Sequence, residues 1–170
     1  FADCSNLTSV KFPKNITTVN RYTFENTPWW NDLCNGKDLV TFNNIVLKYN
    51  KNDNTNFFSI DIPDGVTVIG DDAFDGSSKL TSITLPDSVS YIGNHAFRSC
   101  SALTSINIPD GVSAIGDYAF NSCSGLTSIN IPDSVTYIGD SAFANCSNLT
   151  SVKFPKNLKT VNLFTFDNTP

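Results

Sequence analysis

The feature that most constrains the fold of this chain is a repeat of 23 residues. LTSINIPDGVSAIGDYAFNSCSG begins at Leu103, and LTSINIPDSVTYIGDSAFANCSN follows it at Leu126. Because so short a unit cannot bury its own apolar edge, neighbouring copies must stack to form one continuous core. The sequence therefore predicts a solenoid in which each repeat forms one coil. The repeats are expected at residues 7–29, 57–79, 80–102, 103–125, 126–148 and 149–170.

An insertion and a second, longer repeat organise the rest of the chain. The first repeat begins at Leu7 and the next at Phe57, so that about 27 residues, at 30–56, interrupt the period. Residues 1–28 recur almost unchanged as residues 143–170. We therefore expect one solenoid domain over the whole chain, cut as one module from a longer array of such modules.

Three segments are predicted within each repeat. In the fourth repeat, residues 103–108 alternate between apolar and polar, which is typical of a strand with one buried face. Residues 109–111 predict a turn, residues 112–115 a second extended segment, and Asp117 the cap of a helical turn over 119–123. The inward side chains are then Leu103, Ile106, Ile108, Val112, Ile115, Ala119, Phe120 and Cys123. The predicted fold class is an α/β repeat solenoid with parallel strands and short helical turns.

The insertion predicts a short helix followed by a β-hairpin. Thr27 can cap a helix that begins at Pro28. The runs DLVTF and IVLKY flank Asn43-Asn44, a pair that tolerates the positive φ of a hairpin turn. Trp29 and Trp30 allow two interpretations: they close an apolar seam where the stacking is interrupted, which we favour, or they bind a ligand.

The repeat pattern LxxIxIPDxVxxIGxxAFxxC resembles the BspA-like class of leucine-rich repeat, through IPDxV, IG and AFxxC in several registered copies. The resemblance covers nearly the whole chain. It implies a right-handed solenoid with parallel strands, on a secreted or cell-surface protein that binds host proteins or other cells. The outer repeats depart from the pattern: Lys14-Asn15 and Lys156-Asn157 replace the Asp turn, and Asn20 and Asn162 replace the Gly.

The charge of the chain argues against nucleic acid as a partner. The formal net charge is −5, whereas binding to phosphates requires a basic surface. Residues 57–148 hold ten Asp against Lys79 and Arg98, and the remaining residues carry a net +3. This asymmetry could favour end-to-end contact between copies, although solubility is the simpler interpretation. No apolar run of eighteen residues exists, so we expect no insertion into a membrane.

The cysteines share one position of the repeat, with one exception. Cys4, Cys100, Cys123 and Cys146 all fall there, which predicts a ladder of small, buried free thiols. Neighbouring coils would bring them to about 5 Å, within disulfide range, but three in a row cannot all pair. Cys34, in the insertion, has no evident partner.

No catalytic, metal or cofactor site is expected. His95 is the single histidine, and the chain has no nucleophile motif, no phosphate-binding loop and no CxxC or HxxxH spacing. Two rows of acidic residues leave one alternative open, because stacked carboxylates could hold calcium between coils. We favour a local role, in which the first row shapes turns and the second caps helical turns. The rows are Asp64, Asp87, Asp110 and Asp133, and then Asp71, Asn94, Asp117 and Asp140.

Three functions therefore compete: a protein-binding or adhesion module, a structural spacer, and a glycan-binding module. The face of the first strand offers only small side chains such as Ser82, Ser105 and Ser128, which favours a spacer for that face. The edge that carries the second extended segment and the helical turn is richer in large side chains, expected to be exposed. The candidate partner-binding residues are Tyr91, His95, Arg98, Tyr118 and Tyr137, with Trp29 and Trp30 as further candidates. The partner is expected to be a protein or a glycan.

The ends of the solenoid lead to a separate expectation. A solenoid exposes the apolar edges of its first and last coils unless caps cover them. The last repeat stops at Pro170, which corresponds to Pro28, where the first repeat continues into Trp29. We therefore expect two open faces and head-to-tail association of copies.

Overall fold

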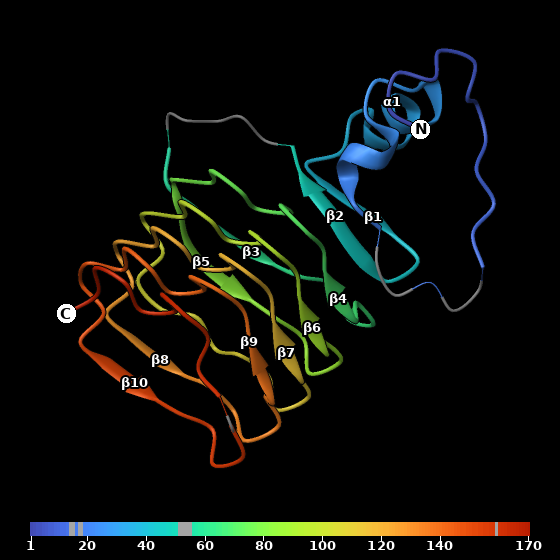
Figure 1. Ribbon diagram of the computed structural model, residues 1–170. Coiled ribbons are helices and arrows are strands. Elements are labelled where there is room, and N and C mark those ends of the chain that lie inside the picture. The colour runs from blue at the N-terminus through green and yellow to red at the C-terminus, as the bar shows by residue number, and fades with distance from the viewer. Residues whose placement is uncertain (14–15, 17–18, 51–55, 159) are drawn as a thin grey trace.

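The computed structural model describes residues 1–170 except residues 14–15, 17–18, 51–55 and 159. Figure 1 shows the coils of the repeats stacked one behind another, ending at the coil that contains the C-terminus. The N-terminal segment and a short helix lie at the opposite end, beyond a β-hairpin. The chain is thus a β-solenoid with little helix, and the predicted stacking of coils is confirmed.

Parallel strands join the coils on two sides of the core. The larger sheet has the order β1-β2-β4-β6-β7-β9, and all of its pairs are parallel except β1 with β2. Its strands are β1 (Leu39–Phe42), β2 (Ile45–Tyr49), β4 (Val68–Ile69), β6 (Tyr91–Ile92), β7 (Ala114–Ile115) and β9 (Tyr137–Ile138). The other side holds the parallel pairs β3 (Phe58–Asp61) with β5 (Leu80–Thr84) and β8 (Ser128–Asn130) with β10 (Ser151–Lys153).

The core contains the side chains that the repeat pattern predicts. All eight inward positions of repeat 103–125 are buried. Phe74, Phe97, Phe120 and Phe143 form a ladder of stacked rings, with centroids 5.2–5.3 Å apart. One expected position differs, because Phe57 is 65% exposed and Phe58 pairs with Leu80 instead, through a register shift between Phe58 and Ser59.

The predicted helical turns are wrong, and with them the α/β assignment of the fold. Between Asn94 and Cys100, alternate backbone N–H groups bond to different coils. The N–H groups of His95 and Phe97 donate to Asp117 and Ala119 of the next coil, at 2.8 Å each. Those of Arg98 and Cys100 donate to carbonyls three residues back in their own coil. Because only every second N–H bonds locally, the segment is a series of turns shared between coils and never completes an α-helical ladder.

Glycine in the IG motif lets successive coils approach closely at these turns. A Cβ built on Gly116 would lie 2.6 Å from the backbone N of Asn94 and 2.7 Å from the carbonyl carbon of Gly93. The last coil has Asn162 at this position, and there the side-chain Nδ2 donates to the carbonyl of Ile138 at 3.0 Å. In the other coils the backbone N–H of the glycine bonds to the preceding coil, as Gly139 does to the carbonyl of Ile115. The side chain of Asn162 takes over this bond in the last coil.

The other departure from the repeat pattern in the last coil also bonds to the preceding coil. Lys156 replaces the usual Asp, and its backbone N donates to Asp133 Oδ1 at 3.0 Å while its Nζ lies 2.9 Å from Oδ2. The corresponding Lys14-Asn15 lies outside the described residues.

The described part of the insertion forms the predicted helix and β-hairpin. Helix α1 (Pro28–Cys34) begins at its proline, and Thr27 Oγ1 accepts from the backbone N of Trp30 at 3.1 Å. Asn43 and Asn44 adopt φ of 47° and 62° in the hairpin turn. The pairing of β2 with β4 adds a feature that the sequence did not reveal: Ile45 lies opposite Val68, one period of 23 residues later. Strand β2 therefore takes the place of a coil's second extended segment.

A second apolar core joins the hairpin to the N-terminal segment. Its buried residues are Val19, Phe24, Trp30, Val40, Ile45, Leu47 and Val68. Trp29 is half-buried and its ring lies 4.9 Å from that of Phe24 and 5.7 Å from that of Phe42. The 3-10 helix η1 (Arg21–Phe24) belongs to this unit. With Trp30 only 5% exposed, the tryptophans close the seam, and their candidacy as partner-binding residues is not supported.

The cysteine ladder forms in three of its four predicted positions. Cys100, Cys123 and Cys146 are fully buried free thiols, and each Sγ donates to a phenylalanine carbonyl of the preceding coil at 3.1–3.2 Å. The prediction for Cys4 is wrong, because Cys4 lies exposed on the first coil, where no preceding coil covers it. Cys34 is half-buried, near Asn50.

Candidate functional site

The predicted binding edge is built from the turns that follow β4, β6, β7 and β9. One position of these turns has φ of 54–56° in four successive coils, where it is occupied by Asp72, His95, Tyr118 and Ser141. The parallel register brings these side chains into one row. His95 and Tyr118 stack with ring centroids 5.1 Å apart and planes 10° from parallel. The structure thus brings together His95 and Tyr118, two of the five residues that the sequence placed on this edge.

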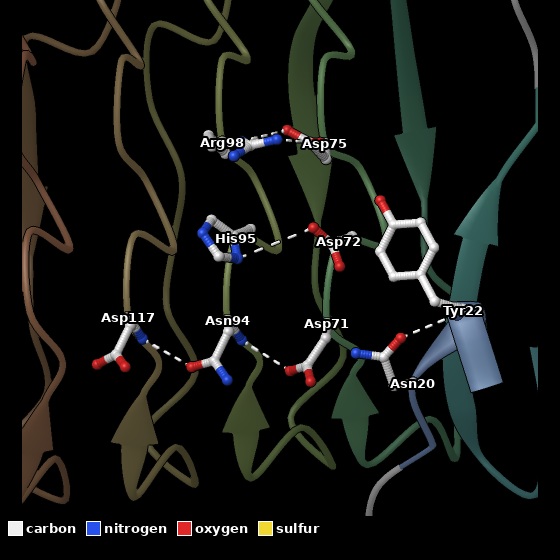
Figure 2. A network of polar contacts seen from close by, with 9 residues as sticks. All are labelled: Asn20, Tyr22, Asp71, Asp72, Asp75, Asn94, His95, Arg98 and Asp117. Carbon is white, nitrogen blue, oxygen red and sulfur yellow. Dashed lines mark hydrogen bonds and ion pairs between the residues drawn. The ribbon is translucent and has the colours of Figure 1, made fainter.

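His95 and Arg98 each face an acidic residue of the preceding coil. His95 Nδ1 lies 3.8 Å from Asp72 Oδ1, a contact that becomes an ion pair when the imidazole is protonated. Arg98 donates from Nε and Nη2 to the two carboxylate oxygens of Asp75, at 2.8 Å each. These bonds raise the pKa of Arg98, and such a bidentate pair holds the guanidinium in a fixed position. Figure 2 shows both contacts crossing from one coil to the next.

A row of carboxylates and amides runs along the same edge. Asp71 Oδ1 accepts from the backbone N of Asn94, Asn94 Oδ1 from Asp117, and Asp117 Oδ1 from Asp140, at 2.8–2.9 Å. Figure 2 shows the first two links. These residues were predicted to cap helical turns in their own coil, which is wrong, because each instead bonds the backbone of the following coil. No group of three or more His, Cys, Asp or Glu among the described residues is arranged to hold a metal ion.

The two candidate tyrosines of the sheet, Tyr91 in β6 and Tyr137 in β9, behave differently from each other. Tyr91 was expected to be exposed, but it is half-buried and packs against the second core, because the N-terminal segment covers this part of the sheet. Burial raises the pKa of its phenol, and Asp71 and Asp117 add to the effect. Tyr137 is 48% exposed, and its hydroxyl donates to Asp117 Oδ1 at 3.3 Å. Ala114 occupies the coil between them, so the two rings form no continuous row.

The N-terminal segment contributes two residues that sequence reasoning missed. Asn20 caps η1 by accepting from the backbone N of Tyr22 at 2.8 Å, and the Tyr22 ring is 43% exposed. Both lie beside Asp71 and Asp72 (Figure 2). The repeat period could not reveal this contact, because it arises from docking of the first coil against the sheet. The one sequence signal was that Asn20 replaces the expected glycine.

These elements enclose a groove of about 430 Å³. It is lined by Asn20, Tyr22, Asp71, Asp72, Asn94, His95, Arg98, Asp117 and Tyr118. The groove thus combines aromatic faces with carboxylate and amide oxygens, which suit hydroxyl groups and cationic or amide side chains. We call Tyr22, His95, Arg98, Tyr118 and Tyr137 the edge surface.

A larger hollow of about 520 Å³ lies at the turns after the first strands. It is lined by Asp87, Asn107, Ile108, Pro109, Asp110, Gly111 and Asn130, without an aromatic ring or a cation. We favour the groove as the candidate site despite its smaller volume, because aromatic and arginine side chains dominate the energy of most interfaces. Within the described part of the chain, no helix is long and apolar enough to cross a bilayer.

Comparisons with known proteins agree with this fold. The sequence model of the family described as BspA type Leucine rich repeat region (6 copies) matches residues 1–52 and 46–170. A T. pallidum leucine-rich repeat protein is 41% identical over 57% of this chain and 45% of its own, with a TM-score of 0.56. A leucine-rich repeat protein from Bacteroides ovatus is 42% identical over 65% of this chain and 28% of its own, with a TM-score of 0.61. The pneumococcal vaccine antigen PcpA shares the fold, at 20% identity and a TM-score of 0.65, over 75% of this chain and 34% of its own.

The chain spans less than half the length of the T. pallidum and B. ovatus proteins. A search of curated proteins gave no significant match. The two matched regions of the family together extend from residue 1 to residue 170, with the repeat motifs in register. This chain belongs to the BspA-type leucine-rich repeat family.

Proposed function

We propose that this chain is a non-catalytic binding module of a secreted or cell-surface protein, and that its edge surface presents a rigid site to a protein or glycan. Membership of the BspA-type family supports a repeat module that binds or supports other molecules. The observation that carries the binding role is the stacked pair of His95 and Tyr118 beside an acidic groove.

The stacked pair occupies a backbone position that disfavours large side chains. Left-handed φ costs a residue other than glycine about 1–3 kcal/mol, and Asn or Asp tolerates it best. The same position holds Asp72 in the preceding coil and Ser141 in the following one, so the fold does not require an aromatic residue here. His95 and Tyr118 nevertheless occupy this strained position, and Tyr118 is 40% exposed. A role in contact with a partner would explain why two aromatic rings are placed there.

The groove chemistry suits two classes of ligand. The exposed rings of Tyr22 and Tyr118 offer faces on which a sugar ring or an apolar side chain can stack. Asp71 and Asp117 bring carboxylate oxygens to the same groove, where they can accept from sugar hydroxyls or from Lys and Arg of a protein partner. A glycan and a basic protein segment are therefore the partners to test first.

A spacer is the alternative. The face formed by β3, β5, β8 and β10 carries small exposed polar side chains such as Ser59, Ser82 and Ser128, which offer no anchor for a partner. A spacer would need only the stacked coils, with no demand on the edge surface.

Binding of the chain to a glycan array and to a panel of extracellular matrix proteins tests the proposal. The variant His95→Asn with Tyr118→Asn removes the stacked rings but keeps residues that tolerate positive φ. We expect it to lower the affinity for any ligand of the chain at least tenfold, because stacked aromatic contacts are lost.

The matched control lies on the opposite face. Ser105→Ala with Ser128→Ala removes two exposed hydroxyl groups there and should leave affinity unchanged. Circular dichroism should show the same thermal transition in all three proteins. No binding of the unaltered chain in either screen would favour the spacer, and equal binding by both variants would move the site away from the edge surface.

A further inference from the structure

The last coil exposes an apolar surface that is distinct from the edge surface. Phe154 is 46% exposed and Val161 is 51% exposed, whereas Ile131 and Ile138, which occupy the same positions in the preceding coil, are each 1% exposed. Phe166 lies between this surface and the phenylalanine ladder, where its ring stacks on Phe143 at 5.4 Å. The ring of Phe154 packs edge-on against Phe166 at 5.5 Å, with planes 75° apart.

The first coil is a structural twin of the last coil. Residues 1–28 and 143–170 are identical at 22 of 28 positions. The ring pair of Phe1 with Phe24 has a separation of 5.6 Å and an interplanar angle of 7°, against 5.4 Å and 7° for Phe143 with Phe166. The edge-on pair recurs as well, with Phe12 on Phe24 at 5.6 Å and 77°. The same sequence thus builds the same local surface twice.

In the first coil, the chain itself covers this surface. Val19 is 7% exposed where its counterpart Val161 is 51% exposed, and Phe24 is 4% exposed. The cover consists of α1 and the hairpin: Phe12 lies 5.8 Å from the ring of Trp29 and 5.0 Å from that of Phe42. The structure therefore shows which kind of segment fits the surface.

We propose that the apolar surface of the last coil, centred on Phe154 and Val161, is a docking surface for a helix–hairpin segment of the kind formed by residues 28–49. Thr169-Pro170 is identical to Thr27-Pro28, the cap and first residue of α1. Thr169 Oγ1 donates to the carbonyl of Phe143, whereas Thr27 Oγ1 donates to that of Phe24. If a helix began at Pro170, the aromatic side chain after the proline would pack against Phe154, as Trp29 packs against Phe12.

The experiment adds a second copy of residues 29–50 after Pro170 and measures hydrogen exchange of the backbone amides in residues 160–170. In dilute solution, we expect protection of these amides to rise at least tenfold relative to the unextended chain, because the added segment buries Phe154 and Val161. The control extension has Ser at the positions copied from Trp29 and Phe42 and should give no protection. Phe154→Ala in the extended chain should cancel most of the gain.

Circular dichroism of the solenoid, which does not depend on the added segment, verifies that each protein is folded. Equal protection with the two extensions would overturn the proposal, as would a gain that Phe154→Ala leaves intact. A third outcome would also overturn the proposal: the amides gain protection when the unextended chain is concentrated, but gain none when the segment is added. That result would assign the surface to a second copy of the chain. The test is independent of the edge surface, so its outcome does not depend on the proposed binding function.

Discussion

Single side chains in this solenoid stabilise the neighbouring coil as well as their own. Asn94 accepts from the backbone N of Asp117, and Cys123 Sγ donates back to the carbonyl of Phe97, so each side chain satisfies a backbone group of a neighbouring coil. Buried backbone groups must find such partners, and here side chains supply them at the same positions in three successive coils. A polar residue that looks local in one repeat is therefore part of the stacking interaction.

The buried thiols lead to a prediction about alkaline stability. Burial raises the pKa of Cys100 to about 12 and that of Cys146 to about 11, and it raises that of Cys123 well above 9. Above pH 9 the unfolded state loses these thiol protons while the folded state keeps them, so the unfolded state binds fewer protons. The free energy of unfolding should fall as the pH rises from 9 to 11, by up to about 1.4 kcal/mol per pH unit for each thiol.

Urea unfolding between pH 8 and pH 11 measures this slope. Cys100→Ala, Cys123→Ala and Cys146→Ala combined should flatten it, whereas Cys4→Ala, at an exposed thiol, should leave it unchanged. The titration of Tyr91 and Tyr137 contributes equally to all three proteins. A slope that survives the triple substitution would mean that the buried thiols already ionise in the folded chain.

At the scale of the element, the sequence predicted which residues are buried better than it predicted backbone conformation. The positions of Phe120 and Cys123 followed from the repeat alone, because burial depends on the alignment of equivalent residues. The repeat did not determine the backbone conformation of this segment, because Ala, Phe and Cys at these spacings fit an apolar helix face as well as a row of turns. What decides between them is the hydrogen bonding to the next coil, which a single repeat cannot reveal. The hairpin and the start of α1 were predictable because Asn43-Asn44 and Thr27-Pro28 carry local signals.

The glycine of the IG motif provides a test of coil spacing. Gly116→Ala should destabilise the solenoid by about 1–3 kcal/mol, because the new Cβ would lie 2.6–2.7 Å from backbone atoms that cannot move freely. Gly111→Ser is the matched control in the same coil, where Ser88 and Ser134 occupy the equivalent position and donate to Val66 and Val112 at 2.6–2.7 Å. Chemical denaturation of both variants should separate them, and an equal loss of stability would show that close approach at Gly116 is not what the motif provides.

At the scale of the whole molecule, the repeat period explains the stacked coils but not the placement of the first coil. Tyr22 reaches the groove because the N-terminal segment packs on the outer face of the sheet, where Tyr91 joins the second core. Residues 20–24 align with residues 70–74 in the repeat, at an offset of 50, but the insertion at 30–56 separates the two repeats. The repeat alone therefore could not show that Asn20 and Tyr22 lie beside Asp71 and Asp72. The ends of the array are also defined only at this scale, because identical sequences meet different neighbours there.

The open ends predict head-to-tail association of the chain. The last coil exposes Phe154 and Val161, and at the other end Phe1 is 74% exposed with one ring face stacked on Phe24. Within the array, Phe143, the twin of Phe1, instead stacks on both sides, against Phe120 and Phe166. Contact between the last coil of one copy and the first coil of another would give Phe1 a second neighbour, and such heterologous contacts need not close into a ring.

We therefore expect the weight-average mass in light scattering to rise steadily with concentration, without a plateau at a dimer. Extension of the chain by a copy of residues 29–50 after Pro170 should suppress the rise, because the added segment would occupy the surface around Phe154 and Val161. Tyr118→Asn, on the edge surface, should not suppress it, since Tyr118 lies in repeat 103–125, two coils before the last one. A chain that stays monomeric throughout would mean that contact between the two end coils buries too little apolar surface to offset the entropy lost on association.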